Sequence, residues 1–439
     1  MISNHTYITL KFRKIASSIF AIFFFSFGLV LLNTCQKSNI NPDLSKGFIK
    51  YYGGAGGDIA NEVQITSDGG YIIVGTSGSF SNGNSDIYVV KTDKSGNTIW
   101  AKNYGGFGAD SGKSIKETPD GNYIVAGGLV VSVAGTSKIL NQIYLLKINQ
   151  SGDTIWTRKF GYLQNETIAY DIKIAPDGGY LVGASVYYTN AVNGFTRKLY
   201  YLKVNEFGNL AQSLNPLGTE GLASYISSVL PGAIEGEVDF LATSGLINEV
   251  SAGSAESKVY SPIVGKLNKD GNLSQTLDKL SPNVNIPQAL FTGQMKRTPD
   301  GGYIVCGTGI NSETGAFEAF LVKLNSNKDK EGDYIGYSNG FNAVGNSVDI
   351  TSDGGYIITG TIESTNNSGF EIMLIKVDSE GNQQWIKTFG GAADDVGTSV
   401  LQTKDGGYII SGMMSLQSKQ PSNIVMCLIK TDANGKITN

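Results

Sequence analysis

Apolar residues in this chain occur in short, nearly continuous runs, separated by turns rich in glycine, aspartate and asparagine. One turn with its run reads SDGGYIIVG at 67–75, and close copies begin at 119, 176, 299, 352 and 404. Glycine supplies the positive φ that tight hairpin turns need, so Asp-Gly-Gly predicts a hairpin between two strands. Continuous apolar runs are typical of strands that are buried on both faces. The pattern therefore predicts an all-β chain built on a repeat.

A second phrase recurs in step with the first. It reads DIYVVKTDKSGNTIW from 86, QIYLLKINQSGDTIW from 142 and EIMLIKVDSEGNQQW from 371, and its Asp-x-x-Gly-Asn part predicts another tight turn. The fourth copy of the repeat lacks the DGGY phrase and has EGEVDFLATSG from 235 in its place. Each copy of the second phrase has a lysine at the end of its apolar run, and these lysines define seven units of about 56 residues: Lys91, Lys147, Lys203, Lys266, Lys323, Lys376 and Lys430.

Each unit contains four short apolar runs, which in the first copy are EVQIT, YIIVGTS, DIYVVKT and TIWAKNY. Four antiparallel strands repeated at this period predict one blade of a β-propeller. The last unit stops where its fourth strand should begin, whereas KGFIKYYGG from 46 matches fourth strands such as TIWAKNYGG from 98. We therefore expect an all-β, seven-bladed β-propeller of four-stranded antiparallel blades, in which an N-terminal strand completes the last blade and closes the ring.

This layout resembles bacterial β-propeller repeat proteins with DGGY-type repeats, whose blades have a strand order like that of NHL-type propellers. The resemblance is carried by the DGGY-I-x-x-G phrase and the Lys-x-Asp-x-x-Gly-Asn phrase, and it covers residues 47–439. It implies the fold but says little about function, because propellers include binding modules, scaffolds and enzymes.

The N-terminus has the features of an export signal. Three basic residues between 11 and 14 precede an almost wholly apolar stretch at 15–32, and Cys35 follows closely. The segment resembles a bacterial lipoprotein signal, although asparagine and threonine stand before the cysteine where that family prefers smaller residues. The resemblance implies a signal peptide at 1–34, lipidation of Cys35, a tether at 35–46 and the propeller at 47–439. The alternative is an uncleaved membrane anchor.

Both alternatives tether the chain to a membrane and place its propeller outside the cytoplasm. The expected location is the cell envelope, with a lipid anchor in the outer membrane. The membrane is then one partner of the protein, reached through the lipid.

Composition excludes several classes of function. The net charge of −4, with no basic run after residue 14, argues against a nucleic-acid partner. The single histidine, His5, lies in the predicted signal, so the mature chain lacks a Ser-His-Asp triad and histidine-ligated zinc. Cys306 and Cys427 lie in apolar runs and are expected to be buried thiols. We expect no cofactor and no metal site.

Glycine-rich loops that end on an acid precede several units, as in YGGAGGD at Asp58, YGGFGAD at Asp110 and FGGAADD at Asp394 and Asp395. Carboxylates near glycine backbones can bind Ca²⁺, but each loop has only one or two acids. The structural alternative is that each aspartate caps free loop amides. The repeated lysines are expected to pair with neighbouring acids, and the repeated tryptophans to pack in the core: Trp100, Trp156 and Trp385.

The connections between second and third strands differ from blade to blade, and by alternation of strand direction they share one face with the connections between blades. We call this end of the propeller the loop face, and the end with the DGG and DxxGN turns the turn face. Variation at one face of a repeat scaffold is typical of a binding surface. The loop from 185 concentrates residue types favoured at recognition sites, namely Tyr187, Tyr188, Phe195 and Arg197. These four residues, with Asp58, Asp110 and Asp394, form the predicted ligand-binding set, although the tyrosines could equally extend a core strand.

No catalytic residues stand out from the sequence. The favoured interpretation is a membrane-anchored binding or scaffold module for a protein or glycan. The first alternative is a carbohydrate-active enzyme, a hydrolase or lyase, that uses carboxylates on the loop face. The second alternative is a passive structural spacer.

Overall fold

The structure, a computed structural model, describes residues 47–133, 135–162, 165–190, 194–213, 216, 224–247, 258–270, 272, 278–279, 291–311, 313–365, 369–391, 393–416 and 423–438. The predicted signal peptide, Cys35 and the tether lie outside the described residues. No helix within the described ranges is long and apolar enough to cross a membrane.

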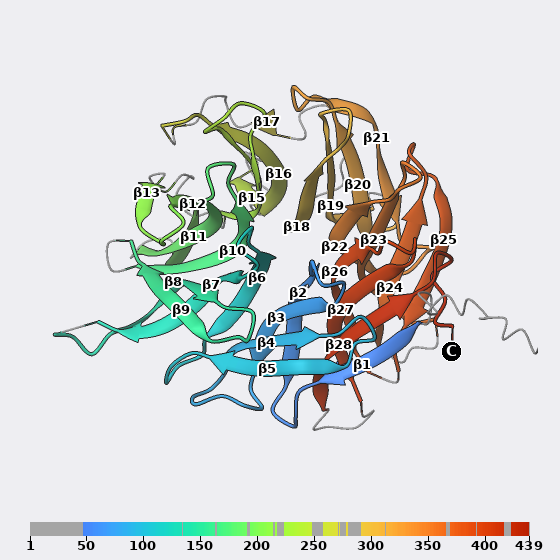
Figure 1. Cartoon of the computed structure of the whole chain (residues 1–439). Coiled ribbons are helices and arrows are strands. Elements are labelled where there is room, and N and C mark those ends of the chain that lie inside the picture. The colour runs from blue at the N-terminus through green and yellow to red at the C-terminus, as the bar shows by residue number, and fades with distance from the viewer. Residues whose placement is uncertain are drawn as a thin grey trace, which may run out of the picture. The chain divides into compact units, whose positions relative to one another are not determined.

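Seven four-stranded antiparallel sheets succeed one another around a ring, which confirms the predicted seven-bladed propeller (Figure 1). The first three blades consist of β2 (Asp58–Ile65), β3 (Tyr71–Ser77), β4 (Asp86–Thr92) and β5 (Thr98–Tyr104); β6 (Ser111–Glu117), β7 (Tyr123–Ser132), β8 (Ile139–Ile148) and β9 (Thr154–Phe160); and β10 (Glu166–Ile174), β11 (Tyr180–Asn190), β12 (Gly194–Val204) and β13 (Leu210–Ser213). The next three consist of β14 (Ser224–Pro231), β15 (Val238–Ile247), β16 (Lys258–Leu267) and β17 (Asp278–Lys279); β18 (Phe291–Arg297), β19 (Tyr303–Ile310), β20 (Phe317–Leu324) and β21 (Lys330–Tyr337); and β22 (Ala343–Ile350), β23 (Tyr356–Glu363), β24 (Phe370–Val377) and β25 (Gln383–Phe389). The seventh consists of β26 (Val396–Gln402), β27 (Tyr408–Ser415), β28 (Ile424–Thr431) and β1 (Phe48–Tyr52).

The N-terminal strand closes the ring as predicted. β1 pairs antiparallel with β28, so the seventh blade combines both ends of the described chain (Figure 1). The hydroxyl of Tyr52 then donates to the carbonyl of Gly96 in the first blade at 2.7 Å. Tyr104 and Tyr337 make the same kind of bond to the blade that follows theirs. Closure therefore repeats an ordinary contact between neighbouring blades.

The apolar runs form the packing between blades. All seven residues of β4 are buried, and each fully buried aliphatic side chain contributes about 1.5–3 kcal/mol. The tryptophans of fourth strands pack against the tyrosine of the DGGY phrase in the next blade, as seen for Trp100 with Tyr123 and Trp156 with Tyr180. The interpretation of the tryptophans as packing residues is confirmed. Both thiols, Cys306 and Cys427, are free and buried, as expected.

The DGG turn needs glycine for two different reasons. Gly69 has a φ of +82°, a conformation that side chains disfavour. A Cβ on Gly70 would lie 2.2 Å from the carbonyl oxygen of Thr92, so the backbone approaches too closely for any side chain.

The repeated lysines anchor these turns. Lys91 reaches the turn carboxylate of Asp68 at 2.7 Å, and Lys376 reaches Asp353 at 2.9 Å. In the fourth blade Glu237, from the divergent EGEVDF segment, takes the place of the turn aspartate and pairs with Lys266. The lysines thus join the third strand to the turn between the first two strands, as the structural interpretation expected.

Candidate functional site

The innermost strand of each blade carries one β-bulge, and these bulges surround the propeller axis. The register with the second strand shifts at Ala60/Glu62 in β2, and equivalent shifts occur in β6, β10, β14, β18, β22 and β26. A bulge leaves its extra residue outside the ladder and re-aims its side chain. The bulge residues are Asn61, Lys113, Tyr170, Ser227, Gly293 with Gln294, Asn346 and Thr398.

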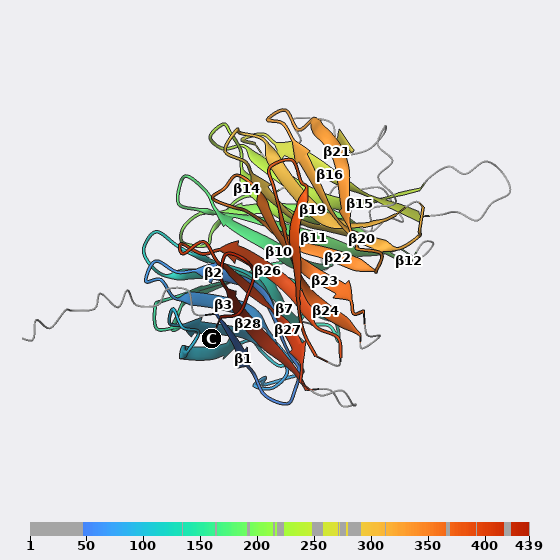
Figure 2. The same cartoon turned by 90° about the vertical axis from the view of Figure 1, so that its right-hand side faces the viewer.

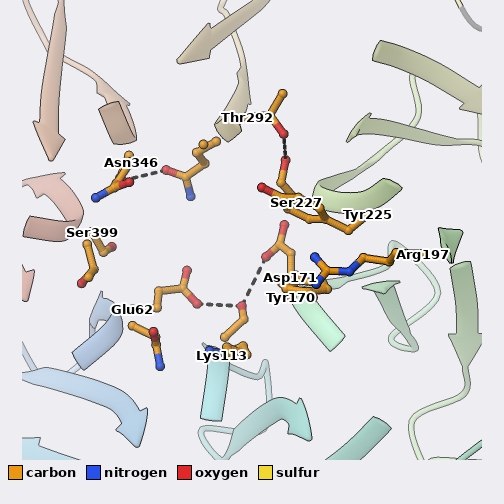
Figure 3. Close-up of a pocket in the computed structure, with 16 residues that line it drawn as sticks. Glu62, Lys113, Tyr170, Asp171, Arg197, Tyr225, Ser227, Thr292, Asn346 and Ser399 are labelled. Carbon is orange, nitrogen blue, oxygen red and sulfur yellow. Dashed lines mark hydrogen bonds between the residues drawn. The ribbon is translucent and has the colours of Figure 1, made fainter. Parts of the chain in front are cut away.

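All of these bulge residues line one cavity of about 540 Å³, here called the axial pocket (Figure 3). The volume falls within the range of roughly 300–1,000 Å³ that is usual for small-molecule sites. The bulges occupy the third to fifth positions of inner strands that begin at the loop face. Arg197, near the start of β12, also lines the pocket. The axial pocket therefore lies toward the loop face.

In six of the seven blades the residue that follows the bulge is polar, for an architectural reason, whereas Met295 takes this place in the fifth blade. The carboxylate of Glu62 accepts a hydrogen bond from the Ile115 amide of the next blade at 2.8 Å. Asp171 accepts one from Val229 at 3.0 Å in the same way. The hydroxyls of Ser114 and Ser347 accept equivalent bonds from the blades that follow them. This belt of hydrogen bonds joins successive inner strands. Two bulge side chains add to it, because the amide of Asn61 donates to the carbonyl of Gly112 at 2.6 Å and that of Asn346 donates to the carbonyl of Gly397 at 2.8 Å.

The two carboxylates of the pocket lie close together but are neutralised. Ser114 Oγ lies 2.7 Å from Glu62 Oε2 and 3.2 Å from Asp171 Oδ1. Glu62 forms an ion pair with Lys116, and Asp171 with Lys173 at 2.6 Å. Burial by itself raises the pKa of Asp171, but the charges of the lysines outweigh burial and hold this pKa below its ordinary value. Both carboxylates are therefore ion-paired with lysines.

Two cations of the pocket have no such partner. Among the described residues, Lys113 makes no hydrogen bond or ion pair, and its partial burial lowers its pKa. The Nε of Arg197 is buried without a hydrogen-bond acceptor. The guanidinium of Arg197 lies instead between two rings, 4.4 Å from the centre of Tyr187 and 5.6 Å from that of Tyr225. The uncompensated charge of the axial pocket is thus positive.

A stack of tyrosines supports Arg197. The rings of Tyr170 and Tyr225 lie 4.9 Å apart, and the hydroxyls of Tyr170 and Tyr187 lie 3.3 Å apart. Figure 3 shows Arg197 extending over Tyr170 and Tyr225 toward the open centre of the pocket. The third blade, β10 to β13, contributes most of this wall together with β14.

The structure separates the four residues predicted from the third loop. Tyr187 and Arg197 face each other across β11 and β12, and Arg197 lines the pocket. Tyr188 points to the opposite face of the strand, because successive residues alternate, and packs on Tyr162 with ring centres 6.3 Å apart. Phe195 lies in β12, but its side chain is outside the described residues.

The predicted acids cap loops and do not line the axial pocket. Asp58 is buried and accepts hydrogen bonds from the Gly54 amide at 2.8 Å and the Ser79 hydroxyl at 2.7 Å. Asp110 accepts from the Gly106 amide at 2.5 Å and the Val130 amide at 2.7 Å. These bonds match the capping interpretation of the glycine loops.

The last blade places the capping role on a different residue from the one chosen from the sequence. Asp395, not Asp394, is buried and accepts from the amides of Gly391 and Ser415, each at 2.8 Å. Asp394 is exposed and accepts from the Phe370 amide at 3.0 Å. Within the described ranges, no three acidic, histidine or cysteine side chains gather as a metal site.

Sequence reasoning missed Lys113, Tyr170 and Tyr225, because it looked for variation in loops rather than within strands. A signal for Lys113 and Tyr170, though not for Tyr225, exists in the inner strands, which read ANEV, GKSI, AYDI, ISSV, GNSV and GTSV at equivalent places. A variable residue stands there between a mostly small residue and a polar one, in an otherwise regular repeat. Such a position marks the bulge.

Comparisons with known proteins extend the fold assignment only. No protein-family model matches the chain, and no curated protein sequence matches it. A solved ulvan lyase, from a new family of polysaccharide lyases, is 10% identical with a TM-score of 0.53, over 87% of this chain and 94% of its own. The ulvan lyase structure bound to -[GlcA(1-4)Rha3S]- covers the same shares at 10% identity and a TM-score of 0.51. An α-L-arabinanase of Penicillium chrysogenum with arabinobiose is 11% identical, over 73% and 92%, with a TM-score of 0.45. At these identities the likeness to the two ulvan lyase structures shows the fold alone.

Proposed function

We propose that this protein is a membrane-anchored, extracytoplasmic binding module that holds its ligand in the axial pocket. One observation carries the proposal: a bulge residue from every blade lines a single cavity, and these residues differ in size and charge from blade to blade. Asn61 and Asn346 also bond to the inner strand of the next blade, whereas Lys113 makes no hydrogen bond or ion pair among the described residues. Polar and aromatic side chains that vary within a regular repeat and gather around one cavity are typical of a recognition site.

The proposed location in the cell envelope is supported by the N-terminal segment. A basic start, an apolar stretch at 15–32 and Cys35 favour a lipid anchor in the outer membrane. The ligand is then a glycan or protein of the envelope or its surroundings. Carbohydrate is the favoured class, because the pocket combines amides, hydroxyls and tyrosine rings.

The test is capture of ligands by the wild-type chain and two variants, from envelope extracts and on a glycan array. Tyr170→Ser introduces the residue that stands at the same bulge in the fourth blade, Ser227, so the strand should tolerate it. We expect it to weaken binding about tenfold, because it removes the middle of the tyrosine stack. Asn382→Ala, on an exposed turn of the turn face, is the control and should bind as the wild type does. Loss of binding in the Asn382 variant alone would contradict the proposal.

The second candidate function is a carbohydrate-active enzyme, and the ulvan lyase likeness favours a lyase over a hydrolase. Glycoside hydrolysis needs a carboxylic acid whose pKa is raised. Although Glu62 and Asp171 lie close together, the pKa of Asp171 is lowered and both are ion-paired. Incubation with acidic polysaccharides separates the two candidates. A lyase releases unsaturated products that absorb in the ultraviolet, and a binding module leaves the polymer length unchanged.

A further inference from the structure

We infer that the ligand of the axial pocket is an acidic saccharide, whose carboxylate or sulfate is held by Lys113 and Arg197. This inference rests on the proposed function and specifies its ligand. It follows from the state of the charged groups in the pocket. Both acids are compensated by lysines, whereas both of these cations are open to an incoming anion.

The geometry at Arg197 favours an anion in particular. Contacts with the rings of Tyr187 and Tyr225 hold the guanidinium in place without using its hydrogen-bond donors. A pre-oriented guanidinium with free donors matches the two oxygens of a carboxylate or sulfate. Lys113 adds a second, point-like charge from β6, and Figure 3 shows both side chains bordering the same space. An anion bound between them would compensate the positive charges of Lys113 and Arg197, which have no acidic partner among the described residues of the pocket.

The rest of the lining favours a saccharide over a peptide. Neutral amides and hydroxyls complete the wall: Asn61, Gln294, Asn346, Thr398 and Ser399. Such groups complement the several hydroxyls of a sugar ring, and Tyr225 offers an aromatic surface beside them. Inner strands of all seven blades surround the pocket, so it suits a terminal sugar or a side branch. An extended peptide would need an open groove or a free sheet edge.

The experiment measures binding by calorimetry to the full chain in detergent, with four probes. These are tri-galacturonate, a sulfated cellotriose, neutral cellotriose and a tri-glutamate peptide. We expect at least one of the two acidic sugars to bind at least tenfold more tightly than cellotriose. Whether carboxylate or sulfate binds more tightly identifies which anion the site selects, and either result supports the inference.

Variants then assign the charge recognition to the two cations. Lys113→Asn introduces the residue found at the same bulge in the first and sixth blades, Asn61 and Asn346, so the fold should be kept. We expect affinity for the acidic sugar to fall about ten- to a hundredfold. Arg197→Gln should act similarly, whereas Arg197→Lys should retain part of the affinity because it keeps the charge. Lys94→Asn, on an exposed turn of the turn face, is the matched control and should change nothing.

Three results would overturn the inference. Equal binding of cellotriose and the acidic sugars, unaffected by Lys113→Asn, would reject the anion while leaving a binding pocket in place. Binding of tri-glutamate as tight as that of the sugars, with the same response to Lys113→Asn, would reject the saccharide. Binding of none of the probes would reject the acidic sugar as ligand. The proposed function fails separately, if no captured partner depends on Tyr170.

Discussion

The ring of Phe48, in the first strand that the structure describes, lies 6.3 Å from the ring of Tyr71 in the first blade. In other blades a tryptophan of the fourth strand makes this contact with the DGGY tyrosine of the next blade, as Trp385 does with Tyr408 at 5.8 Å. Phe48 therefore occupies the tryptophan place of the seventh blade. The contact that joins blades elsewhere also closes the ring.

Removing this contact should loosen the closure of the propeller. Phe48 is partly buried in the core shared by the first and seventh blades, and Phe48→Ala should lower the free energy of unfolding by about 2 kcal/mol. Tyr51→Ala, in the same strand but 48% exposed, should change it by less than about 0.5 kcal/mol. Urea unfolding of both variants measures the difference. Equal destabilisation would mean that strand pairing, rather than the Phe48 contact, holds the closure.

The lysine-anchored turns predict a loss of stability in acid. Burial alone raises the pKa of Asp68, but hydrogen bonds, above all from Lys91, lower it to about 2, below its ordinary value of 3.8. The net pKa of Asp300 and that of Asp353 are also about 2. A lowered pKa in the folded state stabilises the fold above the unfolded pKa, and this stabilisation is lost as the pH falls through the folded pKa. The effect should therefore appear between about pH 4 and pH 2.

A triple variant tests this effect, with Asp68, Asp300 and Asp353 each changed to asparagine. These carboxylates are more than half exposed, so each ion pair contributes only a few tenths to about 1 kcal/mol. We expect the free energy of unfolding of the triple variant to be lower by about 1–2 kcal/mol at neutral pH. Below pH 4 its stability should fall less steeply with pH than that of the wild type. Melting temperatures over this range provide the measurement. If the melting temperatures of the variant and the wild type fell in parallel with pH, the three aspartates would not be the source of the loss of stability in acid.

Two adjacent acids should differ sharply in their effect on stability. Asp395→Ala removes the acceptor of two loop amides in a buried setting, which should cost about 1–3 kcal/mol. Asp394→Ala removes one bond at an exposed side chain and should cost less than about 1 kcal/mol. Chemical unfolding of the two variants side by side measures both. A larger loss at Asp394 would reverse the assignment of the cap.

Lipidation at Cys35 predicts how the protein partitions between membrane and soluble fractions. Cys35→Ser removes the acceptor for the lipid, so the variant should be released or accumulate as an unprocessed precursor. Labelling with radioactive palmitate and fractionation of the membranes measure this. Wild-type protein that stays in the membrane but never takes up the label would point to the uncleaved anchor. Cys306→Ser and Cys427→Ser change buried thiols and should leave labelling intact.

The capping acids illustrate where sequence reasoning reached its limit. The loop phrase FGGAADD contains two neighbouring aspartates, and local chemistry alone does not separate them. Which of the two aspartates caps the loop depends on Ser415, at the end of the second strand of the blade, because its amide donates to Asp395. A contact of this kind between residues 20 apart in sequence is set by the pairing of strands.

The repeat by itself determined the propeller. The DGG and DxxGN turns are encoded by four or five consecutive residues, since positive φ and side-chain caps are local properties. The nearly continuous apolar runs determined the strands, and the match of KGFIKYYGG to fourth strands determined the closure. The sequence also predicted the divergent fourth blade, whose EGEVDF segment contains Glu237, the acid that pairs with Lys266.

The tertiary structure alone decided the site. Lys113, Tyr170 and Tyr225 are about 55 residues apart along the chain, and no local pattern shows that they come together. They meet because each lies on the innermost strand of its own blade, and because the ring brings seven such strands around one axis. Arg197 was identified from its loop, but its partner Tyr225 comes from the next blade. A repeat specifies one blade at a time, whereas the axial pocket exists only once all blades have closed.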